Sequence, residues 1–267
     1  DNLLFQEAIK LGVEVKQEKV NKVTFSKDRF EITGSKSSYS AKIVLGAFGK
    51  RSNLDRSLER DFFRKSAPWM AAKWHFSEEN FPEDLVGLHN FPGGYCGLSK
   101  TETGAVNLCF LATYESFGRY KDPELFREKI LRKNPFLDDF LSQAKPLFEK
   151  PLSIAQVSFR RKDAVHQHML MLGDAAGLIH PLCGNGMAMA IHSGKIAAEV
   201  LLEQLHLPEQ DFRESIENAY NRRWKQEFHS RLTAGKWLQK LLLNDSLAEI
   251  SQAVIARFPS LLPGIIK

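Results

Sequence analysis

A glycine-rich crossing between an apolar strand-like run and a helix is where this sequence could do chemistry. It reads GDAAGLIHPLCGNGMAMAIHSG, from Gly173 to Gly194. Glycine weakens strands and helices, so its repeated use here indicates that something approaches the backbone closely. Gly184 and Gly186 would expose N–H groups at the helix start, where the helix dipole is positive. We therefore predict a site for an anionic or electron-rich group at this crossing.

The predicted helix after the crossing has almost no side-chain bulk on one face. Its small residues recur at spacings of three and four: Gly186, Ala190, Gly194 and Ala197. Two interpretations are open, because either a flat ligand or a closely packed sheet would fit against such a face. Asp174 is equally open, since an aspartate at a strand end either binds a ligand or caps N–H groups in a turn.

Other reactive side chains near the crossing have weaker support. Cys183 has no neighbouring base or resolving cysteine in the sequence, so a packing role is favoured. His180 is left without a role. His166 and His168 lie two apart in a predicted strand and would share one face, but no further ligand accompanies them, so we predict no metal site.

The three cysteines are too few and too scattered for a disulfide scaffold or a zinc site. A hairpin that turns at residues 101–104 would place Cys96 opposite Cys109, within reach of a disulfide. In a reducing compartment we expect both to be free thiols.

Length and composition describe a globular chain. Its 267 residues are 43% hydrophobic, which suffices for one large domain or two of ordinary size. No apolar run reaches the roughly 18 residues of a membrane span, and no secretory signal pattern is present, so we expect a cytoplasmic protein.

The formal net charge of +5 does not indicate a nucleic-acid protein, because the basic residues are not interleaved with aromatics along one element. Arg160, Arg161 and Lys162 form one short cluster. A late helix carries a second set: Arg222, Arg223, Lys225, Arg231, Lys236 and Lys240. We expect both sets to be solvated faces; attraction of an anionic substrate or a membrane surface is the alternative.

The elements that must position the crossing follow from hydrophobic periodicity. A first helix ends at Gly12, as expected of a left-handed glycine after a helix end. Residues 13–47 indicate an antiparallel meander leading into an apolar strand at 43–47, which we expect to be buried on both faces. An aromatic-rich second sheet follows at 68–114. The later segments predict helical structure at 122–144, strands at 154–159 and 164–172, and helices at about 185–205, 212–243 and 246–257.

Three motifs carry a family resemblance. The segment GDAAGLIHPLCGNGMAMAIHSGKIAAEVL resembles the second flavin-binding motif of FAD-dependent oxidoreductases with the p-hydroxybenzoate hydroxylase fold, particularly their geranylgeranyl reductase-like branch. IVLGAFGKRSNLDR, from Ile43 to Arg56, resembles the family's Gly-Ala-Asp-Gly-x-x-Ser signature, with Phe48 in place of its aspartate. FPGGYCGLSK, at Phe91 to Lys100, resembles a substrate-sheet segment of the reductases without its tryptophan.

The resemblance implies a set of FAD contacts. Asp174 would bind the ribityl or ribose hydroxyls, and the turn from Pro181 to Met187 would lie beside the isoalloxazine ring. The backbone of Gly186 and Met187 would stabilise negative charge on the reduced ring, and no catalytic acid or base is assigned. The implied cofactor-binding residues are Gly46, Gly49, Arg51, Gly173, Asp174, Pro181, Gly184, Asn185, Gly186 and Met187. NAD(P)H is the electron donor that the resemblance implies.

The substrate would lie between the flavin and the aromatic sheet, which favours an apolar or aromatic small molecule or a lipid. Trp74, Phe91 and Tyr95 are the residues we expect to line it, from a wider set that includes Trp69, Phe76 and Phe110. The alternative is that most of these aromatics form the core of the sheet.

The implied fold is α/β (α+β): an incomplete FAD-binding Rossmann-like domain, an antiparallel substrate-binding sheet and C-terminal helices. The expected parts are residues 1–50 (FAD domain), 51–165 (substrate sheet), 166–205 (return to the FAD domain) and 206–267 (helical region). The Gly-x-Gly-x-x-Gly turn that holds the ADP half of FAD is absent from the sequence, which also opens inside a helix without methionine. We expect a chain entered partway through a larger domain, with weak or no FAD binding of its own.

Two enzymatic functions remain open: hydride transfer to an alkene such as a prenyl lipid, and monooxygenation through a flavin hydroperoxide. A halogenase is disfavoured because the Trp-x-Trp-x-Ile-Pro signature is missing. A third hypothesis is a non-catalytic module that binds a lipid or a protein partner. Peripheral membrane contact by the basic late helices is a minor alternative.

Overall fold

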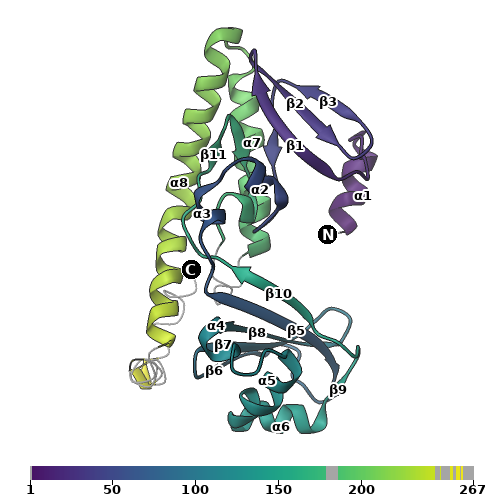
Figure 1. Ribbon diagram of the computed structural model, residues 1–267, viewed down its shortest axis with the longest axis vertical. Coiled ribbons are helices and arrows are strands. Elements are labelled where there is room, and N and C mark those ends of the chain that lie inside the picture. The colour runs from purple at the N-terminus through teal and green to yellow at the C-terminus, as the bar shows by residue number, and fades with distance from the viewer. Residues whose placement is uncertain are drawn as a thin grey trace.

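The computed structural model describes residues 2–178 and 186–243, together with 247, 253, 254, 257, 258 and 260. Figure 1 shows an upper region of short strands and a lower region built on one antiparallel sheet, with a long helix along one side. Much of the predicted helix at 246–257 lies outside the described residues. Within them, no helix combines the length and apolar character needed to cross a bilayer.

The upper region begins as the sequence predicts. Helix α1 (Asn2–Lys10) ends before Gly12, whose φ of 84° is the expected left-handed conformation. An antiparallel meander follows in the order β1 (Val20–Ser26), β2 (Arg29–Gly34) and β3 (Ser38–Ala41). Alternation along β1 and β2 buries Val23 and Phe30 against the rest of the region.

A second small sheet joins segments that are far apart in the sequence. Its order is β11 (Val165–His166), β12 (Met169–Met171), β4 (Leu45–Gly46), and β12 pairs with β4 in parallel. The prediction that residues 43–47 are buried on both faces is wrong, because Leu45 is 41% exposed. The cause is that β4 has a strand neighbour on one side only among the described residues.

Two long helices cover this sheet. They are α7 (Gly186–Gln204) and α8 (Glu209–Leu242), close to the predicted bounds. Met169, Leu170 and Met171 form a buried cluster with residues of both helices, and Tyr220 donates a hydrogen bond from Oη to the Met171 carbonyl at 2.6 Å. The apolar strand is thereby fixed against α8.

The lower region is the predicted second sheet. Its strands run in the order β10-β5-β8-β7-β6, and β9 also pairs with β5. The bounds are β5 (Trp69–Ser77), β6 (Val86–Phe91), β7 (Gly94–Lys100), β8 (Val106–Thr113), β9 (Lys145–Pro146) and β10 (Leu152–Val157). All of its pairings are antiparallel.

Short helices lie against and around this sheet. They are α4 (Tyr114–Phe117), α5 (Pro123–Lys129), a 3₁₀ turn η1 (Leu131–Lys133) and α6 (Pro135–Gln143). Two further short helices, α2 (Asn53–Ser57) and α3 (Asp61–Arg64), lie in the upper region (Figure 1). Helices α5 and α6 start alike, since Asp122 and Asn134 accept hydrogen bonds from the first-turn N–H groups and proline follows each cap. Both cover the face turned away from the upper region (Figure 1).

Alternation along the strands decides which aromatics face these helices. Trp74 and Phe91 point into the helix-covered core, with Phe110 and Phe126 as neighbours. They are buried there, so the prediction that Trp74 and Phe91 line a substrate is wrong, and the alternative of a sheet core is confirmed for them. Tyr95 points to the other side, which we call the opposite face of the sheet.

The two cysteines of the sheet also point to different faces. The loop between β7 and β8 contains five residues, 101–105, because Lys100 pairs with Val106. The sequence-based turn at 101–104 is one residue shorter, and a shift of one residue moves a side chain to the other face. Cys109 therefore lies opposite Gly97 and Cys96 opposite Phe110, so the predicted juxtaposition is wrong, while both thiols are free as expected.

Candidate functional site

Parallel pairing brings the two flavin-motif segments together. Met171 of β12 pairs with Gly46 of β4, and the Leu172 N–H donates to the Gly46 carbonyl at 2.9 Å. Both strands therefore end at the same place, where residues 47–52 and 173–178 continue as loops. We call this place the two-loop edge. Ligands of parallel sheets bind outside such carboxyl ends.

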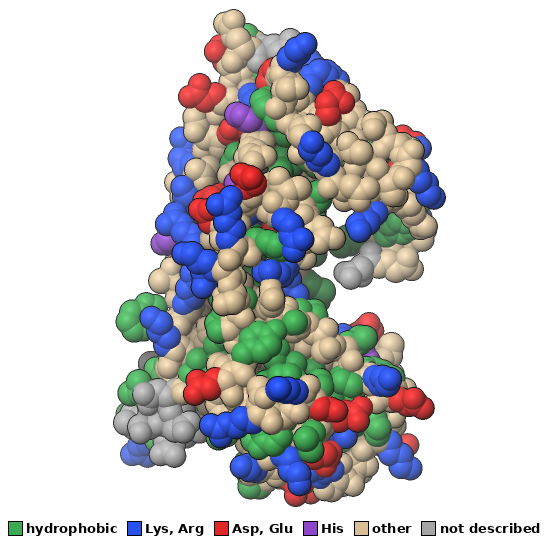
Figure 2. Space-filling view, viewed as in Figure 1, with side chains coloured by type: hydrophobic (Ala, Val, Ile, Leu, Met, Phe, Trp, Pro, Cys, Tyr) green, Lys and Arg blue, Asp and Glu red, His purple; other side chains and the backbone are tan. Residues whose placement is uncertain are grey.

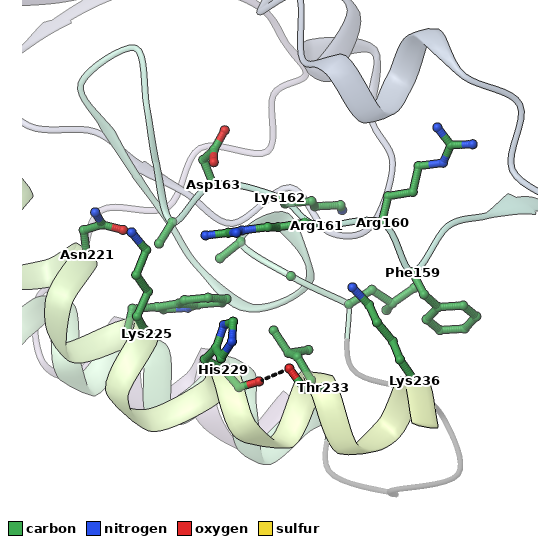
Figure 3. A pocket seen from close by; sticks show the side chains of 16 residues that line it. Phe159, Arg160, Arg161, Lys162, Asp163, Asn221, Lys225, His229, Thr233 and Lys236 are labelled. Carbon is green, nitrogen blue, oxygen red and sulfur yellow. Dashed lines mark hydrogen bonds between the residues drawn. The ribbon is translucent and has the colours of Figure 1, made fainter. Parts of the chain in front are cut away.

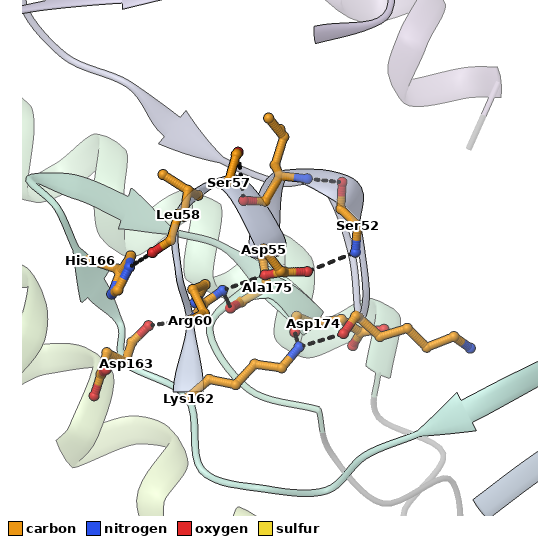
Figure 4. Close-up of polar contacts among 12 residues, drawn as sticks. Ser52, Asp55, Ser57, Leu58, Arg60, Lys162, Asp163, His166, Asp174 and Ala175 are labelled. Atoms are coloured by element: carbon orange, nitrogen blue, oxygen red, sulfur yellow. Dashed lines mark hydrogen bonds and ion pairs between the residues drawn. The ribbon is translucent and has the colours of Figure 1, made fainter. Parts of the chain in front are cut away.

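A buried lysine ties the two loops together. Lys162 donates from Nζ to the carbonyl oxygens of Lys50 and Asp174, each at 2.7 Å (Figure 4). It is only 6% exposed, and burial lowers its pKa from the ordinary 10.5 to about 8. The prediction that Lys162 belongs to a solvated basic cluster is therefore wrong.

A buried ion pair between Arg60 and Asp55 also contacts both loops. Arg60 is 3% exposed and Asp55 fully buried, and Arg60 Nη1 lies 3.2 Å from Asp55 Oδ1. The same Nη1 donates to the Ala175 carbonyl at 2.8 Å, and Asp55 Oδ2 accepts the Ser52 N–H at 2.7 Å (Figure 4). Each loop is thus held by one member of the pair.

Sequence reasoning missed Lys162, Arg60 and Asp55 as residues of the site. One signal was readable, because Ser52 and Asp55 have the spacing of a capping box, and the structure contains that box at the start of α2. The burial of Arg60 and Lys162 had no local signal. It depends in part on distant carbonyls, since Lys162 and Lys50 are 112 positions apart and Arg60 and Ala175 are 115 apart.

The glycines of the two-loop edge have different functions. A Cβ on Gly46 would lie 2.7 Å from Met171 Sδ, and one on Gly173 would lie 3.0 Å from Ala190 Cβ, so both glycines permit close packing. Gly49 differs, because its φ is 81° and no atom lies within 4 Å of the position of its Cβ. Its backbone is open to a ligand.

Gly177 and Gly194 differ in how closely the protein packs around them. A Cβ on Gly177 would lie 3.1 Å from the Trp224 ring, which gives this glycine a packing role against α8. Gly194 has no atom within 4 Å of its Cβ position, so close packing is absent there. It occurs at Ala190, and Ser193 Oγ accepts the Gly173 N–H at 2.8 Å.

Arg51 and Asp174 are suited to a cofactor that offers both anionic and hydroxyl groups. Nη1 of Arg51 is buried without a hydrogen-bond partner, and its guanidinium lies 4.0 Å from the centre of the Phe63 ring. Asp174 is half-buried, and burial raises the pKa of its carboxyl, opposed by the charges of Lys50 and Lys162. A buried unpaired donor is costly, so the edge fits a ligand such as FAD.

Several predicted cofactor residues extend beyond this edge. Met187 in the first turn of α7 is 75% exposed and Gly186 is half-buried. Pro181, Gly184 and Asn185 lie outside the described residues, as do His180 and Cys183. The contacts expected at the isoalloxazine ring therefore stay predictions.

The opposite face of the sheet begins beside the two-loop edge. Tyr95 packs with Trp69, Leu111 and Val157, and Leu178 of the second loop packs against this group. Lys50 acts electrostatically on both Asp174 and Cys109. The other residues on this face include Lys73, His75, Leu88, Asn90, Gly97, Ser99, Asn107, Cys109, Leu152 and Ile154.

The opposite face of the sheet has exposed side chains, whereas helices bury the side chains of the other face. Leu88, Leu152 and Ile154 are exposed, and burial raises the pKa of the Cys109 thiol against the opposing charges of Lys73 and Lys50. A ligand that extends from the two-loop edge would meet apolar side chains here.

His166 and His168, which the sequence places on one strand face, contact different groups. His166 Nε2 lies 2.8 Å from the Leu58 carbonyl, and His168 Nδ1 lies 2.9 Å from Glu217 Oε1. No group of three or more metal-ligating side chains gathers anywhere in the described part of the chain.

Comparison with known proteins gives relatives but no matching family model. The chain is 28% identical over 234 residues to a digeranylgeranylglycerophospholipid reductase from Methanocaldococcus jannaschii, covering 84% of this chain and 57% of that protein. It is 25% identical over 241 residues to the enzyme of the same name from Methanosarcina acetivorans, covering 85% and 56%. The chain thus spans little more than half the length of these relatives.

Solved structures share the fold. A geranylgeranyl bacteriochlorophyll reductase-like protein from Thermoplasma acidophilum has a TM-score of 0.72 at 19% identity, covering 99% of this chain and 72% of that one. The flavin-dependent brominase Bmp2 has a TM-score of 0.76 at 17% identity, covering 99% and 67%. Klebsiella pneumoniae HpxO, solved with FAD and uric acid, has a TM-score of 0.74 at 13% identity, covering 98% and 69%.

Proposed function

We propose, from the FAD-dependent oxidoreductase fold of this chain and its homology to digeranylgeranylglycerophospholipid reductases, that it forms part of the FAD site of an oxidoreductase acting on an apolar lipid. The observation that carries the proposal is the two-loop edge. Lys162 and Arg60 hold both motif segments by their backbone carbonyls, and this leaves Arg51 Nη1 and the Asp174 carboxylate for a ligand.

Each residue of the edge has a role in this proposal. Asp174 accepts hydrogen bonds from ribityl or ribose hydroxyls, and Arg51 with the open backbone of Gly49 binds an anionic part of the cofactor. Lys162 and Arg60 position these groups without contacting the ligand. FAD, when bound, supplies hydride transfer, and backbone N–H groups at the start of α7 stabilise negative charge there.

The opposite face of the sheet is the proposed place of the substrate. Its exposed leucine and isoleucine side chains suit the hydrocarbon part of a prenyl lipid, and the homologous reductases are named for such a lipid. The homology favours reduction. Monooxygenation is the second candidate, because the structural neighbours include a brominase and HpxO with bound urate.

Flavin titration of Arg51→Ala and Asp174→Asn variants tests the proposal. Fluorescence quenching measures binding of FAD, FMN and riboflavin, which differ in their phosphates. We expect Arg51→Ala to weaken FAD and FMN about tenfold, by loss of a charge-assisted hydrogen bond, and to spare riboflavin. Asp174→Asn weakens all three flavins if Asp174 binds the ribityl hydroxyls, and FAD alone if it binds the ribose.

Arg56→Ala is the matched control, since Arg56 is an exposed arginine of the same segment. Equal loss in Arg56→Ala and Arg51→Ala would contradict the site and favour the non-catalytic module. Where flavin binds, anaerobic reduction of a prenyl lipid supports the reductase, and substrate-coupled oxygen uptake supports the monooxygenase.

A further inference from the structure

A pocket rich in basic residues lies on the side of the two loops that faces α8. It is formed by the segment 159–164, which leads from β10 to β11, by the end of the second loop at 176–178, and by one face of α8 (Figure 3). The α8 residues that line it are Asn221, Trp224, Lys225, His229, Leu232, Thr233 and Lys236. We call it the basic pocket.

The rim of the basic pocket carries excess positive charge. Arg160, Arg161, Lys225 and Lys236 are exposed at the rim, and Asp163 is its single carboxylate. None of these four cations forms an ion pair within the described residues; the Arg160 guanidinium donates only to the Ser66 carbonyl, at 3.4 Å. Figure 2 shows Lys and Arg side chains gathered along the α8 side of the molecule.

Other arginines of α8 provide the contrast. Arg213 pairs with Asp28, Arg223 pairs with Glu203, and Arg231 lies 3.2 Å from Glu227. These three arginines have carboxylate partners, whereas Lys225 and Lys236 on the pocket face have none among the described residues. Unpaired cations that converge on one pocket favour an anionic ligand.

The buried residues that line the pocket are apolar except for Lys162 and the indole N–H of Trp224. Ala164, Ala176 and Gly177 are buried, and Trp224 is 4% exposed. Nε1 of Trp224 is buried and has no hydrogen-bond partner. The indole N–H can only donate, so this buried group also calls for an acceptor.

We propose that the basic pocket binds a phosphate group, carried either by a lipid or by a soluble phosphate ester. Arginine and lysine at the rim supply charge and donors to the phosphate oxygens, as the guanidinium fork does in phosphate sites generally. The buried apolar residues accommodate the group to which the phosphate is attached. The site goes beyond the proposed flavin function, because Gly49, Arg51 and Asp174 are not among its lining residues. It shares with the two-loop edge the loop end at 176–178 and Lys162, whose Nζ already donates to two carbonyls.

Charge reversal at the rim tests the proposal. Lys225→Glu/Lys236→Glu removes two cations of the pocket, and Arg222→Glu/Lys240→Glu makes the same change in charge on α8 outside the lining residues. Calorimetric titration with pyrophosphate, and flotation with phosphatidylcholine vesicles with or without phosphatidic acid, measure binding. Circular dichroism and thermal melting verify that both variants fold, and Arg161→Gln serves as a milder variant.

We expect the pocket variant to bind phosphate at least about tenfold more weakly, while the matched control binds like the unmodified chain. Binding of pyrophosphate identifies a soluble ester as the source, and binding only to vesicles with phosphatidic acid identifies a lipid. Equal weakening in both double variants would mean attraction by net charge alone and would overturn the site. Absence of binding to pyrophosphate and to both vesicles would also overturn it.

Discussion

The two-loop edge and the aromatic core of the lower sheet are held together by different kinds of side chain. The core buries Trp74, Phe110 and Phe126 against helices, with ring centres 5.9 Å and 5.1 Å apart for successive pairs. The edge buries Asp55, Arg60 and Lys162. Arg60 and Lys162 donate to backbone carbonyls, and Asp55 accepts from Arg60 and from the Ser52 N–H. The core is apolar and closed, whereas the edge is charged and next to open backbone.

The difference shows how buried charges hold the backbone of the proposed ligand site in place. Apolar packing is non-directional and would leave the loop carbonyls of Lys50, Asp174 and Ala175 without donors. Buried cations fix those carbonyls in place and leave Arg51 and the Asp174 carboxylate for other partners. The cost is that each buried charge is tolerated only while it is paired.

Among the tests of this contrast, we expect removal of Arg60 to have the largest effect on stability. Arg60→Ala leaves Asp55 buried without its cation and the Ala175 carbonyl without a donor, so we expect a loss of about 3–5 kcal/mol in the free energy of unfolding. Urea unfolding followed by circular dichroism measures it. Arg223→Ala, which breaks an exposed pair with Glu203, is the control and should change stability little. A similar loss in both variants would show that the buried Arg60–Asp55 pair contributes no more to the free energy of unfolding than the exposed pair does.

A second test uses the pH dependence of stability. Burial lowers the pKa of Lys162 to about 8 in the folded chain, whereas the unfolded chain has the ordinary value of 10.5. The unfolded state therefore binds more protons between these values, so the contribution of Lys162 makes the folded state more stable as pH rises from 8 to 10.5. Lys162→Met should remove this rise, which urea unfolding of both proteins across that range measures. An unchanged slope would contradict the burial of the charged lysine.

The order of elements was predictable from the sequence because hydrophobic periodicity and turn residues determine it. The meander, the aromatic sheet and the long helices follow from such local patterns, as at Gly12 and Asp122. Register was not predictable in the same way. One added loop residue, Ala105, moves Cys109 from its expected place opposite Cys96 to a place opposite Gly97.

The site was predictable in part. The motifs predict Gly49, Arg51 and Asp174 as cofactor residues, which stays a prediction, and the structure brings both motif segments to one edge. Lys162 and Arg60 were not found, because a short basic cluster usually indicates a solvated face and burial depends on distant segments. The lining aromatics were misplaced at Trp74 and Phe91 because the composition of a strand does not reveal which of its faces meets a helix.

The smallest effects on stability are expected at two glycines of the two-loop edge, Gly173 and Gly49. Gly173→Ala introduces a Cβ 3.0 Å from Ala190 Cβ at a φ of 52°, so both crowding and backbone strain oppose it, and we expect a loss of about 1–3 kcal/mol. Gly49→Ala at a φ of 81° meets no atom within 4 Å, so only strain of about 1 kcal/mol applies. Thermal melting compares the two stabilities, and flavin titration should show the reverse order, because the Cβ at Gly49 occupies the space proposed for the ligand. If Gly49→Ala binds flavin as the unmodified chain does, the open backbone at this position does not contact the cofactor.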